Sequence, residues 1–271
     1  TLECGQIFRF RPYKKGYLVF SGDKAAYAYN DGEKAVVFTD YAEYFYDFFD
    51  LKRDYAEIFS AAKNEGIEVL SVAANEGKGI RILNQNKFES ALSFIVSQNN
   101  NIPRIKGIIE RLCEGSGEKK VFGLKDENGK DERIEYYAFP EPEALAKKDS
   151  DFFVKAGLGY RAAYVKRFAE KIVNGFSLEE LAKLSTPNLK KELLSVYGIG
   201  EKVADCISLF GFHRSDSFPV DTWIEKVYRE NMNGKEKTRA KITEELTMRF
   251  KDNAGYYQQY LFYYKRSIEN R

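Results

Sequence analysis

Cysteine is scarce in this 271-residue chain, which also has one histidine and one tryptophan. Its three cysteines, Cys4, Cys113 and Cys206, stand far apart and form neither a Cys-x-x-Cys pair nor a metal-ligand spacing. Three thiols cannot pair completely, so the simplest interpretation is a reduced, cytosolic protein with free thiols. The same spacing argues against a structural zinc site and against an iron–sulfur cluster.

The chain also lacks a large net charge and a long apolar run. Its formal net charge of +2 is too weak by itself to indicate a nucleic-acid-binding protein, so any anion-binding surface must be local. No apolar run approaches the roughly 20 residues that cross a bilayer, and the opening TLECGQIFRF does not look like a signal peptide. We therefore expect a cytoplasmic protein with no membrane partner. Because position 1 is threonine, we also expect residues to be missing before it.

Aromatic residues, by contrast, are plentiful, with 21 phenylalanines and 19 tyrosines. A hydrophobic share of 44% and a charged share of 31% are typical of a globular protein rather than of a disordered chain. The length allows one large domain or two ordinary ones with a real core. Aromatic packing or stacking is therefore expected to matter in the fold.

Two kinds of periodicity divide the chain. Residues 6–38 alternate apolar and polar residues between the breaks KKG, SGD and NDGE, which predicts an antiparallel meander with tight turns. Residues 39–66 change to apolar residues at three- and four-residue intervals, with Thr39 or Asp40 as a candidate helix N-cap. Residues 115–139 are polar and contain ENG, which predicts a loop or a small β-hairpin.

Most of the remaining chain is predicted to be helical, with Gly and Pro at the boundaries. The predicted helical ranges are 67–75, 87–98, 103–115, 142–148, 151–157, 161–175, 177–184, 186–196, 201–212, 221–231, 237–250 and 255–267. The expected fold class is α+β, with an N-terminal antiparallel β domain and its following helix over residues 1–75. A large α-helical domain is expected over residues 76–271, with a helical hairpin at 189–210. The C-terminal helix is expected to pack back toward the N-terminal domain.

The stretch YGIGEKVADC, residues 197–206, joins two of these predicted helices. Gly198 and Gly200 let the backbone turn tightly and let another molecule approach it closely. The unpaired N–H groups at the start of the second helix form an anion site that suits a nucleic-acid phosphate and needs no basic side chain. An ordinary turn between helices also explains the glycines, so the hairpin alone leaves both interpretations open.

Lys202 and Cys206 are four residues apart and share one helix face. The helix dipole and partial burial are expected to lower the pKa of Lys202, which would make its amine a nucleophile. Further along, Asp221 in FPVDTW is a candidate N-cap of a helix and also a carboxylate that could stabilise positive charge near the amine. The alternative is a solvated lysine, a small buried cysteine and an aspartate that only caps.

YGIGEKVADC followed by FPVDTW resembles the helix-hairpin-helix DNA glycosylases, and most closely the 8-oxoguanine DNA glycosylase/lyase (Ogg1-type) branch. Four further stretches support that branch: CGQIFRFR (4–11), FIVSQNNNIPRI (94–105), GLGYRAAYV (157–165) and GYYQQYLF (255–262). They run in family order over nearly the whole chain. The resemblance implies a twisted antiparallel N-terminal sheet, a helical body with DNA in a cleft, and an enzyme that flips the damaged base out of the duplex.

The resemblance also implies roles for the two candidate catalytic residues. Lys202 would attack C1′ of the damaged nucleotide, expel the base and form a Schiff base, while Asp221 would stabilise the cationic sugar and orient the amine. β-Elimination would then nick the strand, so the implied base-excision-repair enzyme is both a DNA N-glycosylase and an abasic-site lyase. Monofunctional relatives keep the aspartate but lack the lysine. No cofactor is implied for catalysis.

A base pocket follows from the same resemblance. The main-chain carbonyl of Gly5 would accept a hydrogen bond from N7–H of 8-oxoguanine, a proton that guanine lacks. Gln258 would contact the Watson–Crick edge, with Phe262 and Cys206 stacking on opposite faces of the base. Without the resemblance, Gln258 and Phe262 would be interpreted as a surface amide and a core aromatic of an amphipathic helix.

Contacts to the opposite strand are implied at two further stretches. Asn99 would enter the gap left by the flipped base, Arg104 and Arg161 would hold the unpaired cytosine, and Tyr160 would wedge the base stack. Asn101 is independently a candidate N-cap, and without the resemblance Arg161 would be a solvated residue. Other DNA contacts are implied at Gly198, Gly200, Val203 and Trp223. Animal members of the branch carry a histidine at the Trp223 position, so a phosphate contact or a pocket detail is expected to differ there.

A structural cation (Na⁺, K⁺, Mg²⁺ or Ca²⁺) is implied at the hairpin, held by the main-chain carbonyls of Leu194, Val196 and Ile199. The implied partner is double-stranded DNA containing 8-oxoguanine opposite cytosine, bound by a monomer associated with the nucleoid if the source is bacterial or archaeal. One alternative is a helix-hairpin-helix glycosylase for another damaged base, against which Gly5 and the 258–262 helix argue. The other is a non-catalytic DNA-binding scaffold, which would not need Lys202 and Asp221 together.

Overall fold

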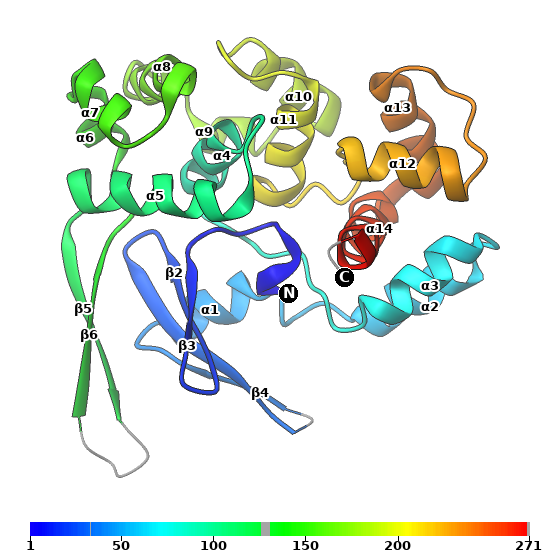
Figure 1. Cartoon of the computed structure of the whole chain (residues 1–271), viewed down its shortest axis with the longest axis horizontal. Helices are drawn as coiled ribbons and strands as arrows, with labels where there is room; N and C mark the ends of the chain where they lie inside the picture. The colour runs from blue at the N-terminus through cyan, green and yellow to red at the C-terminus, as the bar shows by residue number, and fades with distance from the viewer. Residues whose placement is uncertain (33, 126–130, 270–271) are drawn as a thin grey trace. The chain divides into compact units, whose positions relative to one another are not determined.

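The computed structural model describes residues 1–32, 34–125 and 131–269 (Figure 1). The chain forms two compact units, each assembled from separate segments. Unit 1 consists of Thr1–Gln6, Phe49–Asn84 and Glu180–Arg271, and unit 2 consists of Ile7–Phe48 and Gln85–Glu179. The predicted sequence boundary between residues 75 and 76 stays a prediction.

Unit 2 contains the N-terminal sheet that the alternating pattern predicts. Its strands are β1 (Phe10–Tyr13), β2 (Gly16–Ser21), β3 (Lys24–Asp31) and β4 (Lys34–Phe38). They pair antiparallel in the order β1-β2-β3-β4. The turn residues Lys14 and Gly22 have φ of 47° and 58°, as the Gly- and Lys-rich breaks require. The expected antiparallel meander is confirmed.

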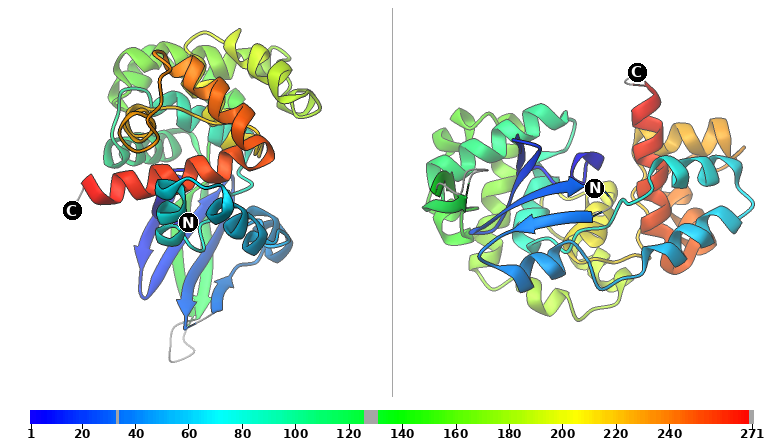
Figure 2. Two further views of the ribbon diagram at one scale, coloured as in Figure 1. Left: turned by 90° about the vertical axis from the view of Figure 1, so that its right-hand side faces the viewer. Right: turned by 90° about the horizontal axis from the view of Figure 1, so that it is seen from below.

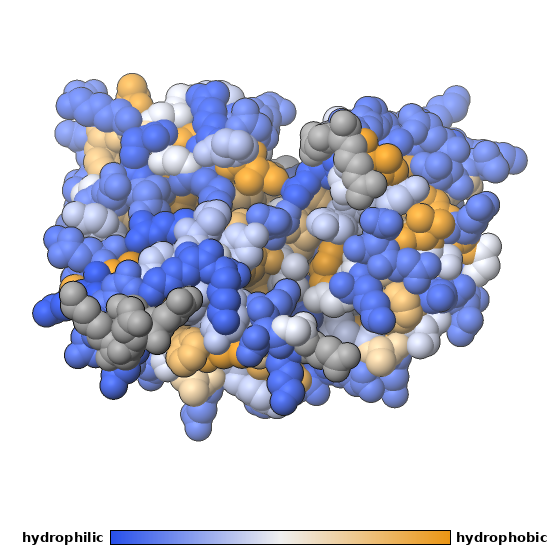
Figure 3. Space-filling model, turned by 60° about the horizontal axis from the view of Figure 1, so that its bottom comes forward, coloured by the Kyte–Doolittle hydropathy of each residue, from blue (hydrophilic) through white to orange (hydrophobic). Residues whose placement is uncertain are grey.

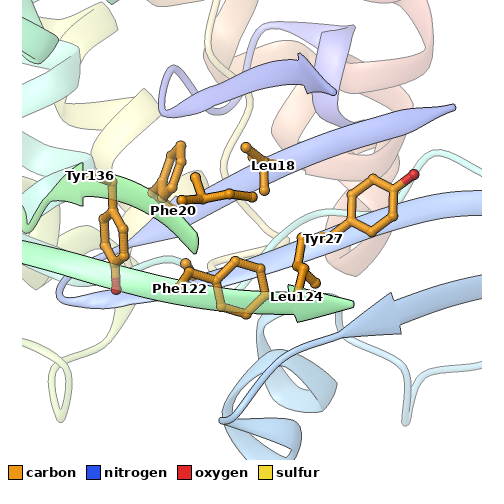
Figure 4. Packing of buried hydrophobic residues seen from close by; sticks show 8 residues of the cluster. Leu18, Phe20, Tyr27, Phe122, Leu124 and Tyr136 are labelled. Carbon is orange, nitrogen blue, oxygen red and sulfur yellow. The ribbon is translucent and has the colours of Figure 1, made fainter. Parts of the chain in front are cut away.

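A second hairpin covers one face of this sheet. Strands β5 (Lys119–Lys125) and β6 (Asp131–Tyr137) pair antiparallel, so residues 115–139 hold a β-hairpin and not only a loop. Phe122, Leu124, Ile134 and Tyr136 from the hairpin bury their side chains against residues of β2 and β3, as Figure 4 shows for most of the cluster. The ENG stretch of the predicted turn falls in 126–130, outside the described residues.

A buried ion pair ties the sheet of unit 2 to a helix. Arg9 Nη1 lies 3.4 Å from Glu89 Oε2, which also accepts the N–H of Gly22 at 2.7 Å. Arg9 donates further bonds to the carbonyls of Gly22 and Tyr137. Burial raises the pKa of Glu89, although Arg9 acts in the opposite direction. Through these bonds the pair ties the turn at Gly22 and the end of β6 to the helix that carries Glu89.

Three helices of unit 2 begin at side-chain caps, one of which the sequence predicts. Asn86, Asn101 and Asp149 each accept a backbone N–H at a helix start, which confirms the prediction for Asn101. Phe88 and Phe168 stack with centroids 5.6 Å apart and join two of these helices. The elements are α1 (Ala42–Phe48), α4 (Lys87–Val96), α5 (Ile102–Ser116), α6 (Pro142–Ala146), α7 (Ser150–Lys155), η2 (Gly159–Arg161) and α8 (Ala162–Val173).

Unit 1 is helical. Its long C-terminal helix α14 contacts α3, α12, α13 and the short η1, and Figures 1 and 2 both show it beside α3. The elements are η1 (Leu2–Cys4), α2 (Tyr55–Asn64), α3 (Glu68–Glu76), α10 (Thr186–Leu194), α11 (Glu201–Cys206), the π-helical turn η3 (Ile207–Gly211), α12 (Thr222–Asn231), α13 (Arg239–Phe250), η4 (Lys251–Asn253) and α14 (Ala254–Glu269). The short α9 (Leu178–Leu181) spans the division between the units.

The helical pattern of residues 39–66 is interrupted, which the periodicity does not show. Helix α1 ends at Phe48 and α2 begins after its N-cap Asp54. Between them Asp50 has φ of 50°, and its carboxylate accepts bonds from Arg53 Nε and Tyr55 Oη, each at 2.8 Å. These side-chain bonds stabilise the break. The Thr39 hydroxyl accepts the N–H of Tyr41, just before α1.

One face of the molecule is mostly polar at its surface. On the face seen in Figure 3, hydrophilic residues dominate and hydrophobic ones form small separate patches. Among the described residues, none of the helices combines the length and the apolar character that crossing a membrane requires.

Candidate functional site

The predicted hairpin is formed by α10, a glycine-containing turn and α11. Gly198 has φ of 88°, a left-handed conformation that favours glycine, whereas Gly200 caps α11 with φ of −99°, which any residue adopts. A Cβ on Gly200 would meet no atom within 4 Å. Gly198 is therefore explained by the turn. Among the described residues, no contact requires glycine at Gly200.

An ion-pair cluster that the sequence analysis missed holds the two helices of the hairpin together. Lys190 Nζ on α10 lies 2.9 Å from Glu201 and 2.8 Å from Asp205 on α11. Burial raises the pKa of Asp205 to about 6, with Lys190 opposing the shift. The two acids are four residues apart on one helix face, a spacing that could have suggested a shared partner.

Lys202 lies in the first turn of α11, beside Cys206 and Asp221. Loss of solvent disfavours its ammonium form, but the charges of Cys206 and Asp221 and a hydrogen bond with Cys206 outweigh this, and the pKa of Lys202 is raised. The expected lowering is therefore wrong for the chain without DNA. Burial raises the pKa of Cys206 to about 11, so this residue is a neutral thiol at pH 7. At pH 7, therefore, desolvation acts to lower the pKa of Lys202 and the carboxylate of Asp221 acts to raise it.

Asp221 caps a helix, and its charge also acts on Lys202. Its Oδ1 accepts the N–H groups of Trp223 and Ile224, each at 3.0 Å, so Asp221 is the N-cap of α12, as predicted. The same carboxylate acts on Lys202 electrostatically. The cap bonds fix the carboxylate on a helix end, and this holds a negative charge close to the amine.

Gln258 and Phe262 lie one turn apart on α14. Gln258 is 4% exposed, and its Nε2 donates to the carbonyl of Pro219 at 3.2 Å. Its buried Oε1 has no hydrogen-bond partner in the described part of the chain. The alternative of a surface amide is therefore wrong. A buried acceptor without a partner costs roughly 1–3 kcal/mol, and a ligand that donates to it would recover that free energy.

Gly5 packs directly against this part of α14. It has φ of 86°, and a Cβ at this position would lie 3.0 Å from Phe262 Cε1 and 2.9 Å from Arg266 Nη1. Both the backbone conformation and the close approach therefore require glycine. Unit 1 thus brings together Gly5 and Phe262, which are at opposite ends of the sequence, and it also contains Lys202, Cys206, Asp221 and Gln258.

The residues predicted to contact the opposite strand all lie in unit 2. Asn99 has φ of 45°, and its Nδ2 donates to Tyr160 Oη at 3.3 Å. Arg161 is 3% exposed and donates to the carbonyls of Gln98 and Asn99, the latter at 2.8 Å. The alternative of a solvated Arg161 is therefore wrong, because its guanidinium holds the left-handed Asn99 turn. Arg104 is exposed, with Nη2 3.5 Å from the carbonyl of Gly157.

The remaining predicted contacts differ in exposure. Val203 is buried, so a DNA contact there would have to use its main chain. Trp223 is partly exposed, and Lys226 Nζ lies 5.1 Å from the centre of its ring.

The carbonyl of Val196 accepts the N–H of Ile199 at 3.0 Å, which closes the hairpin turn around the predicted cation ligands. Among the described residues, His, Cys, Asp and Glu side chains form no group of three that could hold a metal ion.

Comparison with known proteins decides the family. Residues 92–252 match the family model described as HhH-GPD superfamily base excision DNA repair protein. The chain belongs to this superfamily. Residues 1–91 match the 8-oxoguanine DNA glycosylase N-terminal domain, which places the HhH-GPD chain in the Ogg1-type branch and confirms the predicted resemblance.

Solved structures of HhH-GPD proteins confirm the fold class. MBOgg1, solved in complex with a low-affinity DNA ligand, is 35% identical with a TM-score of 0.89, over 99% of this chain and 91% of that one. The 8-oxoguanine glycosylase/lyase of Clostridium acetobutylicum, solved with DNA containing cytosine opposite 8-oxoG, is 34% identical with a TM-score of 0.88 and the same coverage. The N-glycosylase/DNA lyase of Saccharomyces cerevisiae is 31% identical, but the match covers 57% of this chain and 42% of that protein.

Proposed function

We propose that this chain excises 8-oxoguanine from double-stranded DNA and then cleaves the abasic site, acting as a bifunctional glycosylase and lyase. The observation that carries the proposal is the pairing of Lys202, at the start of α11, with Asp221, at the N-cap of α12. A scaffold that only binds DNA has no need to hold a desolvated amine beside a fixed carboxylate. The relatives named N-glycosylase/DNA lyase support the same class of enzyme.

In the proposed reaction, Lys202 supplies the nucleophile. Its unprotonated Nζ attacks C1′, the N-glycosidic bond breaks, and the departing base takes the bonding electrons and then a proton. The Asp221 carboxylate stabilises the positive charge that develops on the sugar. Opening of the sugar ring gives a Schiff base, and loss of a proton from C2′ breaks the C3′–O bond. A bound nucleotide would exclude the remaining water around Lys202, and desolvation lowers the pKa of an ammonium, which favours the reactive amine.

The proposed base pocket comprises the carbonyl of Gly5, the amide of Gln258 and the faces of Phe262 and Cys206. Gln258 Oε1 is a buried acceptor that a donor on the Watson–Crick edge of guanine would satisfy. The neutral thiol of Cys206 can pack against a base without repelling it. The Gly5 carbonyl would distinguish 8-oxoguanine from guanine by the N7–H that only the oxidised base carries.

Recognition of the opposite cytosine is proposed for Asn99, Arg104, Tyr160 and Arg161. Tyr160 is 52% exposed and bonded to Asn99, so the two can present a polar and aromatic edge to a base stack. The N–H groups after Gly200 would bind a phosphate of the same duplex. The carbonyls of Leu194, Val196 and Ile199 lie at and just after the end of α10, and carbonyl oxygens suit a hard structural cation. We further propose that the protein binds DNA as a monomer.

Borohydride trapping tests the proposal. The duplex would carry one 8-oxoguanine opposite cytosine, and the proteins would be the intact chain, Lys202→Gln, and the control Lys183→Gln. Lys183 is an exposed residue paired with Glu180, so its loss should change nothing. We expect covalent adducts with the intact chain and the control, and none with Lys202→Gln.

Other outcomes would replace the proposal. Base release without any adduct would indicate a glycosylase that uses water with Asp221. Tight binding with neither adduct nor base release would indicate a scaffold. Excision of alkylated bases in preference to 8-oxoguanine would indicate a helix-hairpin-helix glycosylase for another lesion.

A further inference from the structure

The turn that contains Gly5 is held in place by two buried glutamines. Gln6, with an exposed fraction of 0%, donates from Nε2 to the carbonyl of Arg81 at 2.7 Å and accepts the N–H of Leu83 at 2.8 Å. Gln259, 1% exposed, donates from Nε2 to the carbonyl of Cys4 at 2.8 Å. One glutamine therefore restrains the chain after Gly5, and the other restrains the peptide before it.

These restraints matter because Gly5 lacks a side chain. Glycine has more backbone freedom than any other residue, so the direction of its carbonyl has to be set by its neighbours. The carbonyl of Cys4 belongs to the peptide unit whose nitrogen is that of Gly5, and this unit is planar. A bond that fixes the Cys4 carbonyl therefore fixes the orientation of the whole Cys4–Gly5 peptide plane. The φ angle of Gly5, 86°, describes the rotation that follows this plane.

Gln259 also sits next to the proposed pocket residues in the sequence. It follows Gln258 directly and precedes Phe262 by one helical turn, so its bond to Cys4 connects the turn to the helix that carries both. The turn has other attachments to the same helix, because Arg266 donates to the carbonyl of Glu3 and Phe262 packs on Gly5. Removing the Gln259 bond should therefore loosen the Gly5 peptide without detaching the turn.

We propose that Gln259 is a positioning residue for base recognition, whose hydrogen bond to the Cys4 carbonyl aims the Gly5 carbonyl at the bound base. The proposal rests on the function proposed above. Gln259 does not touch the base in this scheme and acts only through Gly5. The step it affects is recognition of the oxidised base. It has no part in the chemistry of Lys202 at the sugar.

Two DNA substrates separate recognition of the oxidised base from the chemistry of Lys202 at the sugar. Single-turnover rates would be measured on a duplex with 8-oxoguanine opposite cytosine, and on the same duplex with a preformed abasic site, which has no base to recognise. The variants are Gln259→Leu, which lacks the donor, and Gln259→Glu, which keeps the shape and can donate only when protonated. Ser267→Ala is the matched control, since its hydroxyl donates within α14, to the carbonyl of Tyr264.

We expect Gln259→Leu to excise 8-oxoguanine roughly tenfold more slowly, with cleavage of the abasic site within about twofold of the intact chain. Gln259→Glu, measured across a range of pH, should show the same split where its carboxyl is ionised, and part of the loss should be recovered relative to the intact chain as the pH is lowered. The control should match the intact chain on both substrates. In the Lys202→Gln background, Gln259→Leu should also reduce the preference for binding 8-oxoguanine over guanine duplexes.

Equal losses on both substrates would overturn the positioning role and show that Gln259 only supports the fold. Unchanged excision by both variants would overturn it as well. If Gln259→Leu does not fold, the isosteric Gln259→Glu variant decides between the same outcomes. Failure of the intact chain to act on 8-oxoguanine, with cleavage of abasic sites retained, would instead contradict the proposed substrate and remove the ground on which the Gln259 proposal stands.

Discussion

At the scale of single residues, Asp205 is a buried carboxylate that forms an ion pair with Lys190. Its pKa is about 6 in the folded chain against an ordinary value of 3.8, so the folded state holds its proton more tightly than the unfolded state does. Its contribution to stability is therefore greatest below pH 3.8 and is lost as the pH rises through about 6.

This shift predicts a pH-dependent difference between the intact chain and Asp205→Asn. Because one pKa unit corresponds to about 1.4 kcal/mol, the intact chain should lose roughly 2–3 kcal/mol relative to the variant between pH 4 and pH 7. Chemical denaturation of both proteins across this range measures the difference. Parallel curves for the two proteins would show that Asp205 does not titrate in this way.

The role of a residue could be predicted only where the neighbouring sequence indicates that role. Asp221 precedes a helical pattern, so its capping role could be inferred from the sequence. The partners of Lys190 and Gln259 could not, because each depends on which segments meet after folding. The bond between Gln259 and Cys4 joins positions 255 residues apart, and no local periodicity contains that information.

At the scale of elements, the hairpin of α10 and α11 contains two glycines with different roles. Gly198→Ala should reduce the free energy of unfolding by roughly 1–2 kcal/mol, because φ of 88° is unfavourable for any residue with a Cβ. Gly200→Ala should leave stability nearly unchanged, because its φ is ordinary and the added methyl group meets no atom. If Gly200 allows a phosphate to approach, Gly200→Ala should still weaken DNA binding several-fold.

Thermal denaturation and fluorescence-based DNA titration, applied to both variants, measure these two effects separately. A stable Gly200→Ala variant with unchanged affinity would show that no ligand approaches this glycine.

The types of the elements were well predicted, because periodicity and turn residues are local features of the sequence. The break between α1 and α2 was not, since it depends on bonds from Arg53 and Tyr55 to Asp50.

At the scale of the whole molecule, neither unit is a continuous stretch of sequence. Unit 1 needs segments from both ends of the chain, and the sheet of unit 2 needs the β5–β6 hairpin to cover Leu18, Phe20 and Tyr27. The two family models nevertheless meet between residues 91 and 92. The boundary between the two family models therefore does not coincide with the division of the chain into two compact units.

Separate expression of residues 1–91 and 92–271 tests this difference. We expect each fragment alone to lack a cooperative thermal transition by circular dichroism, because each leaves apolar surface uncovered. Co-expression should restore part of the folded protein. A cooperative transition in the isolated 1–91 fragment would show that the N-terminal sheet is stable without the hairpin.

The packing of Gly5 against α14 has a consequence for synthesis of the protein. A ribosome makes Gln259, whose side chain bonds to the Cys4 carbonyl, 255 positions after Cys4. A nascent chain would therefore contain Lys202 and Asp221 before Gln259 is present to hold the Gly5 turn. On the function proposed above, products of premature termination upstream of α14 would contain the nucleophile Lys202 without the bond that holds the Gly5 turn.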